Sequence, residues 1–162
     1  YDVATLAPLR GPYPLGWFTV GPSPAPPARR LDAHWEDGVR LVGADLPPEM
    51  AHPGDALDLR LVWSSDTPLA EDYVVFVHLV GDGGAPLAQR DQPPEAGFYP
   101  TSGWAAGEWV ADAYTLTIPA DTPTGVYQLV TGLYQSETNE RLSLASGGDA
   151  FPLQAIQIVD AD

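Results

Sequence analysis

A run of nine residues, 72–80, constrains the fold of this chain more than any other stretch. It is rich in β-branched and aromatic side chains and contains neither glycine nor proline, so it predicts a strand that is covered on both faces. Just upstream, residues 57–64 alternate apolar with polar side chains, which is the period of a strand covered on one face. Together the two predicted strands, joined by a proline-containing connection, form the nucleus of an antiparallel sheet.

Glycine and proline divide the rest of the chain into short segments. There are 16 Gly and 18 Pro among 162 residues, a composition that favours short strands and turns over long helices. Further strands are predicted at residues 39–46, 86–91, 108–118, 127–133 and 151–159. Tyr127, two residues after Gly125, matches the tyrosine corner of immunoglobulin-like domains. The sequence therefore predicts an all-β fold, an immunoglobulin-like antiparallel β-sandwich of seven to nine strands.

The first 30 residues differ in composition from the rest. Seven prolines fall within residues 1–27, so residues 1–30 are predicted to be a proline-rich linker or docking arm, followed by a sandwich domain at 31–162. The aromatic pair Trp17-Phe18 favours docking. Six prolines in the uncharged stretch 11–28 are incompatible with a transmembrane helix. Because the chain starts at Tyr1, we expect it to be cut from a longer or processed polypeptide.

Charge and residue usage exclude several classes of partner. The chain has 22 acidic and seven basic residues, all arginine, and a formal net charge of −15, which repels phosphate backbones and anionic headgroups. We therefore expect no nucleic acid partner and no direct membrane insertion of this segment. Cysteine is absent and the three histidines are far apart in sequence, so no metal site or cofactor is predicted. The possibility that several acidic turns together hold a calcium ion stays open.

No catalytic residues stand out in the sequence. There is no Gly-x-Ser-x-Gly motif, and the nearest string, at residues 21–25, lies in the proline-rich segment, where no strand-turn-helix elbow could form. Glu108 and Asp112 share one face of a predicted strand but would lie about 13 Å apart, beyond the roughly 5–9.5 Å of a glycosidase carboxyl pair. The sequence thus predicts a protein that is not an enzyme. A hydrolase would need carboxyls brought together from distant segments.

The longest irregular stretch, residues 92–107, is of a length that is often functional. If it folds across the outer face of the 72–80 strand, aromatic, amide and carboxylate groups line a shallow groove. Such a groove suits sugars, whose C–H faces stack on rings while their hydroxyls form hydrogen bonds. The candidate ligand-binding residues are Phe76, His78, Gln89, Asp91, Tyr99 and Trp104. In the alternative interpretation, Tyr99 and Trp104 only seal the edge of the sandwich and His78 is structural.

Several strings, in this order, resemble a known module. They are Gly54-Asp55 with Leu57-x-Leu59-x-Leu61-x-Trp63, residues 72–79, residues 88–91, Tyr99-Pro100-Thr101 with Trp104, and Pro123-x-Gly125-x-Tyr127. Over residues 31–159 the chain resembles the extracytoplasmic β-sandwich that follows the membrane region of bacterial protein-mannosyltransferase-type glycosyltransferases. The resemblance implies an extracytoplasmic location, at the cell surface or in the periplasm, and a non-catalytic role beside a membrane-embedded region of the same polypeptide. It assigns no role to individual residues.

Two hypotheses about function follow. The first is a non-catalytic extracytoplasmic module that binds or positions glycan beside a membrane or surface enzyme. The second is a structural or adhesive cell-surface module that makes protein–protein contacts, which the Trp17-Phe18 arm and the acidic surface favour.

Overall fold

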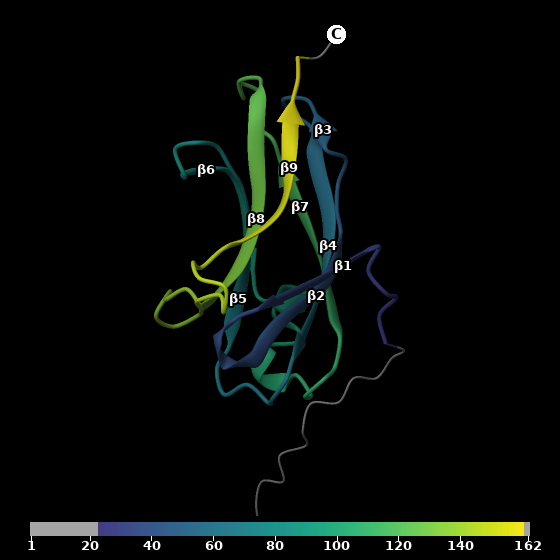
Figure 1. Cartoon of the computed structure of the whole chain (residues 1–162), viewed down its shortest axis with the longest axis vertical. Coiled ribbons are helices and arrows are strands. Elements are labelled where there is room, and N and C mark those ends of the chain that lie inside the picture. Colours follow the sequence, from purple (N-terminus) through teal and green to yellow (C-terminus); the bar gives the residue numbers. More distant parts are fainter. Residues whose placement is uncertain (1–22, 161–162) are drawn as a thin grey trace, which may run out of the picture.

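The computed structural model describes residues 23–160, which form two sheets packed face to face (Figure 1). The four-stranded sheet has the order β1 (Arg29–His34), β2 (Val39–Asp45), β4 (Ala56–Ser65) and β7 (Val110–Thr117). The five-stranded sheet has the order β3 (Met50–Ala51), β9 (Phe151–Ile158), β8 (Gly125–Gln135), β5 (Tyr73–Val80) and β6 (Pro86–Gln92). All strand pairs are antiparallel except β3 with β9. The predicted all-β, immunoglobulin-like sandwich is confirmed.

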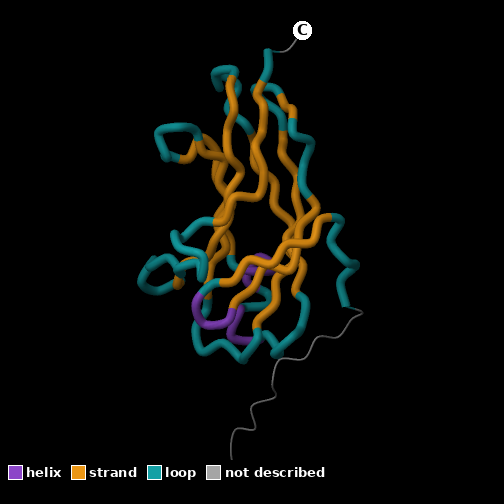
Figure 2. Tube along the Cα trace, viewed as in Figure 1, coloured by secondary structure: helices purple, strands orange, loops and turns teal. Residues whose placement is uncertain are grey.

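Within residues 23–160, helical structure is limited to three short 3₁₀ turns (Figure 2). They are η1 (Glu36–Gly38), η2 (Pro94–Gly97) and η3 (Thr101–Gly103). None of the helical segments in residues 23–160 has the length and hydrophobicity that a membrane span requires.

Strand β5 lies between β8 and β6 and is covered on both faces, as predicted. The prediction that it forms one antiparallel sheet with the 57–64 strand is wrong, because β4 belongs to the other sheet and the connection between them crosses from one sheet to the other. The inward-facing residues of β5, Tyr73, Val75, Val77 and Leu79, are all buried in the core. They belong to the same buried cluster as the inner face of β4, where Trp63 is fully buried and its ring centroid lies 5.4 Å from that of Trp35. Burying a large apolar side chain stabilises a fold by about 1.5–3 kcal/mol, so these two strands supply much of the core.

The boundary between the predicted arm and the sandwich lies slightly earlier than residue 31. Strand β1 begins at Arg29 and pairs with β2. Residues 1–22, including the predicted Trp17-Phe18 arm, are outside the described part of the chain.

The predicted tyrosine corner is present. The Tyr127 hydroxyl donates a hydrogen bond to the carbonyl oxygen of Pro123, 3.0 Å away. This contact fixes the turn that leads into β8.

The connection between β8 and β9 covers the part of the outer face of the five-stranded sheet that carries Phe76. Phe76 on β5 pairs with Gly132 on β8. A Cβ atom on Gly132 would lie 2.4 Å from the Phe76 ring and 2.6 Å from the carbonyl oxygen of Asp149. Only glycine leaves room here for the ring and for the backbone of the connection.

We predict that Gly132→Ala destabilises the fold by about 1–3 kcal/mol, the usual cost of overpacking a filled site. Urea unfolding followed by tryptophan fluorescence measures the change. Gly83→Ala is the matched control, because its added Cβ meets nothing within 4 Å. An unchanged unfolding midpoint for Gly132→Ala would contradict the packing described.

Candidate functional site

Four of the six predicted ligand-binding residues lie on the outer face of the five-stranded sheet. Phe76 is 1% exposed and carries the guanidinium of Arg141 above its ring, 4.3 Å from the centroid. His78 is also buried, and its Nε2 lies 2.8 Å from Oδ1 of Asp91. Gln89, opposite His78 in register, is exposed, as is Asp91. Arg141 belongs to the connection between β8 and β9, so it is this connection that covers Phe76.

Hydrogen bonding already engages part of this face. Burial, followed by the charge and hydrogen bonding of Asp91, raises the pKa of the Tyr134 hydroxyl. Asp91 thus interacts with both His78 and Tyr134. The role of Gln89 and Asp91 in ligand binding stays a prediction.

The other two predicted residues, Tyr99 and Trp104, lie elsewhere, in the connection between β6 and β7, where Trp104 is buried and Tyr99 is partly buried. Trp104 is 2% exposed within the core, and its Nε1 donates to the carbonyl oxygen of Tyr99, 3.3 Å away. The hydroxyl of Thr101 accepts from the backbone N–H of Tyr73 at the start of β5, at 2.9 Å. The loop is therefore tied to the core by a large buried ring and to the start of β5 by a satisfied backbone donor. The expectation that it folds across Phe76 and His78 is wrong, and the six residues do not form one groove.

A different surface combines an accessible aromatic ring with polar groups. Among the four tryptophans of residues 23–160, only Trp109 is not buried. It directly precedes β7, and because its neighbour Val110 packs inward opposite Trp63, Trp109 belongs to the outer face of the four-stranded sheet. In register, it continues a row of outward residues formed by Arg40 on β2 and Ser64 on β4.

Two hollows meet at Trp109. The larger, about 410 Å³, is lined by Arg30, Leu31, Asp32, Arg40, Val42 and Trp109. The smaller, about 180 Å³, is lined by Pro24, Glu95, Tyr99, Glu108, Trp109, Val110 and Ala111. Beside the smaller hollow, Phe98 is 86% exposed. We refer to the two hollows together as the Trp109 surface.

The polar groups of the Trp109 surface are held in place. The Tyr99 hydroxyl donates to Oε2 of Glu108 at 2.7 Å, and the same oxygen accepts from the backbone N–H of Ala105 at 3.0 Å. Partial burial and, secondly, the charge of Asp112 raise the pKa of the Glu95 carboxyl. The guanidinium carbon of Arg30 lies 5.9 Å from the centroid of the Trp109 ring, a cation–π contact.

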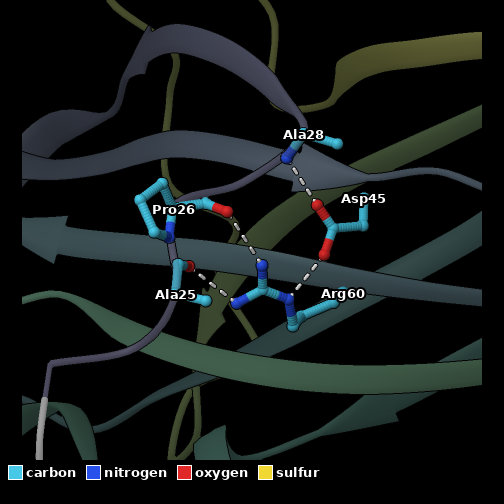
Figure 3. A network of polar contacts seen from close by, with 5 residues as sticks. All are labelled: Ala25, Pro26, Ala28, Asp45 and Arg60. Atoms are coloured by element: carbon cyan, nitrogen blue, oxygen red, sulfur yellow. Dashed lines mark hydrogen bonds and ion pairs between the residues drawn. The ribbon is translucent and has the colours of Figure 1, made fainter.

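A proline-containing segment covers the neighbouring part of the same outer face (Figure 3). Arg60 on β4 donates through Nε to Asp45 at 2.7 Å, and through its Nη atoms to the carbonyl oxygens of Ala25 and Pro26 at 3.1 and 3.3 Å. Asp45 also accepts from the backbone N–H of Ala28 at 2.6 Å. These bonds hold residues 25–28 on the sheet.

The close fit of this segment depends on a glycine. A Cβ atom on Gly43 would lie 2.4 Å from the Pro27 ring and from the carbonyl oxygen of Arg29. Within residues 23–160, the segment 25–28 thus covers the part of the four-stranded sheet around Gly43 and Arg60. The Trp109 surface lies next to this covered part.

The sequence interpretation missed Trp109, Arg30 and Arg40. A usable signal was present for Trp109, since the predicted strand 108–118 has Val110 on its core face, which places residue 109 on the other face. Arg30 lay in the segment predicted as linker. Chemically, the arrangement offers a ring face with guanidinium and carboxylate groups around it. No three His, Asp or Glu side chains within the described residues come together in a way that would hold a metal ion.

The comparisons with known proteins find similarity in structure only. No protein-family model matches the chain, and no curated protein matches it by sequence. The C-terminal domain of Wzt is 12% identical, with a TM-score of 0.48 over 84% of this chain and 83% of that one. A Niemann-Pick type C2 protein from the Japanese carpenter ant is 8% identical, with a TM-score of 0.46 over 82% and 97%. A CARDB domain from Pyrococcus furiosus, crystallised with di-metal ions, is 9% identical, with a TM-score of 0.39 over 81% and 92%. The similarity concerns the fold alone.

The anchoring of the proline segment generates a pH-dependent prediction. The hydrogen bond from Arg60, followed by that from Ala28, lowers the pKa of the Asp45 carboxyl. Its contribution to stability is therefore present above the unfolded pKa, about 3.9, and is lost as the pH falls through the lower folded value. We expect Arg60→Gln to lower the free energy of unfolding by about 0.2–1 kcal/mol at pH 7, as for a partly exposed pair.

Urea unfolding at pH 7 and at successively lower pH values measures this difference. It should shrink once the pH falls below about 3.9, where Asp45 of the unfolded chain gains its proton, and be lost once the pH passes below the lower pKa of the folded protein. Arg90→Gln, which removes the same charge from an exposed position on β6, is the control and should show no such pH dependence. A difference that is as large at pH 2 as at pH 7 would contradict the prediction.

Proposed function

We propose that this chain is a non-catalytic extracytoplasmic β-sandwich module that binds or positions glycan beside a membrane or surface enzyme, and that it binds the glycan at the Trp109 surface. The observation that carries the proposal is the accessible Trp109 ring between two hollows lined by charged side chains. Sugars stack their C–H faces on such rings and direct their hydroxyls to polar groups at the rim.

The rigidity of the surface supports this proposal. Trp109 is adjacent to a buried strand residue, Val110, and Glu108 is fixed by the Tyr99 hydroxyl and the Ala105 N–H. Groups held in place before binding lose less conformational entropy when the ligand arrives. A shallow site can therefore bind with useful affinity even though it encloses little of the ligand.

The association with a membrane or surface enzyme is supported by the resemblance to the sandwich of protein-mannosyltransferase-type glycosyltransferases. In such an arrangement the module acts by holding a glycan close to the active site of its neighbour, because tethering raises the effective concentration of the bound chain. The proposal assigns no catalytic residue to the Trp109 surface.

We predict that Trp109→Ala weakens glycan binding about tenfold or more, because an aromatic contact contributes about 0.5–1.5 kcal/mol in addition to the area it buries. A glycan array, followed by titration calorimetry with the best ligand, measures the effect. Tyr134→Ala, a partly exposed ring on the outer face of the opposite sheet, is the matched control. Mass spectrometry of the ligand after incubation checks that it is not cleaved.

Three results would count against this proposal. If no glycan on the array binds, the proposed function is contradicted. If a glycan binds equally well to the wild type and to Trp109→Ala, the Trp109 surface is not its binding site. Loss of binding in Tyr134→Ala but not in Trp109→Ala would instead favour the outer face that carries Gln89 and Asp91.

The alternative of a structural or adhesive module that makes protein–protein contacts has one supporting observation. Met50 and Val126, which are 61% and 62% exposed, both pair in register with Gln157, from its two sides. With the exposed Gln157 between them, they form a row of two apolar side chains and one polar side chain across β3, β9 and β8 on the outer face of the five-stranded sheet. Exposed apolar groups that lie together are typical of contact surfaces.

For this alternative we predict concentration-dependent self-association that Val126→Ser weakens, because the substitution removes apolar area from the row. Light scattering over a concentration series measures the mass. A mass that stays monomeric at all concentrations would contradict a homotypic adhesive role.

A further inference from the structure

We propose that the glycan bound at the Trp109 surface is acidic, with a sugar ring on Trp109 and a ring carboxylate, as in a uronic acid, held by Arg30 and Arg40. This inference rests on the proposed function of the same surface and specifies its class of ligand.

The distribution of arginines is the first argument. The chain has 22 acidic and only seven basic residues, yet two of the six arginines in residues 23–160 line one hollow. The other four bond to oxygen acceptors within the protein. Arg60 and Arg141 contact the carboxylates of Asp45 and Asp149, Arg29 contacts the carbonyl oxygen of Leu153, and Arg90 contacts the side chain of Gln92.

Arg30 and Arg40 differ from these four. Within the described residues neither guanidinium has a hydrogen-bond acceptor or a carboxylate partner, although Arg30 lies near the Trp109 ring. The Nε of Arg40 is buried and has no hydrogen-bond partner among residues 23–160. Buried donors in proteins nearly always have an acceptor, and in a chain with so many carboxylates an unpaired pair of arginines is unexpected. An anionic ligand would supply the missing negative charge.

The neighbouring groups favour a carboxylate on a sugar over an isolated anion. Trp109 lines the same hollow as both arginines, so a ligand that meets the guanidinium groups is next to a ring face. Asp32, at the edge of the hollow, lies 2.9 Å from Nε2 of His34 and offers carboxylate oxygens to sugar hydroxyls. A planar carboxylate matches the planar fork of arginine. A doubly charged phosphate would be repelled more strongly by Asp32 and by the net charge of −15.

The test compares each acidic saccharide with its own neutral form. Oligosaccharides of galacturonic, glucuronic and mannuronic acid are titrated into the whole chain beside their methyl esters, in which the carboxylate charge is removed and the ring is kept. We expect at least one acid to bind tenfold or more tightly than its ester. Its affinity should also fall as the salt concentration rises, because the guanidinium–carboxylate contact is screened.

Variants of the two arginines locate the effect. Arg30→Gln and Arg40→Gln should each weaken binding of the acid and leave binding of the ester unchanged, whereas Arg90→Gln, which removes an equal charge from the other sheet, should change neither. Circular dichroism and thermal unfolding check that the variants fold. Arg30 is exposed, so Arg30→Gln tests the inference even if Arg40→Gln is unstable.

The outcomes separate this inference from the proposed function. If acids and esters bind equally and Trp109→Ala weakens both, the acidic specificity is overturned while the glycan-binding function stands. If an acid binds more tightly than its ester but Arg30→Gln leaves that preference intact, the assigned carboxylate site is wrong. If no saccharide binds, the proposed function fails and this inference fails with it.

Discussion

The buried core to which β5 and β4 both contribute, one strand from each sheet, is the feature on which the rest of the structure depends. The inward side chains of the two strands are buried throughout, from Tyr73 to Leu79 on one and from Leu57 to Trp63 on the other. Each strand lies inside its own sheet, so every other strand except the two-residue β3 is placed by pairing with one of these two or with their neighbours, and β3 pairs with β9. Because the core uses one face of each sheet, the two outer faces are left for covering segments or for ligands.

Different segments of the chain cover the outer faces of the two sheets. On the five-stranded sheet the β8–β9 connection reaches over Phe76, which needs Gly132 beneath it. On the four-stranded sheet residues 25–28 are held by Arg60 and Asp45, and Gly43 makes room for Pro27. In both cases a glycine in a central strand lets another part of the chain approach the sheet closely. The Trp109 surface lies outside both covers, and for this reason it keeps an aromatic ring accessible.

Alternation of side chains was sufficient to predict most strands and the two faces of β5, because each strand is covered on at least one face and the period of two is imposed by the backbone. It was not sufficient for β1, where Arg29 and Arg30 follow a run of prolines, nor for the two-residue strand β3. The alternation of side chains also does not predict where a long connection packs. From the sequence, Trp104 suits a ligand platform as well as a core. The structure shows that Trp104 packs in the core, in a loop that is tied to the start of β5.

The position of the candidate site follows from that same loop. Trp104 packs inward and ties the loop to the core, after which the chain turns at Gly107 and enters β7 with Val110 facing the core. Trp109 must then face outward, because successive residues of a strand point to opposite faces. The buried tryptophan thus fixes the loop that presents the accessible one. The register of β7 against β4 and β2 brings that ring into line with Arg40, so the aromatic and the cationic parts of the surface are both set by strand pairing and not by a flexible loop.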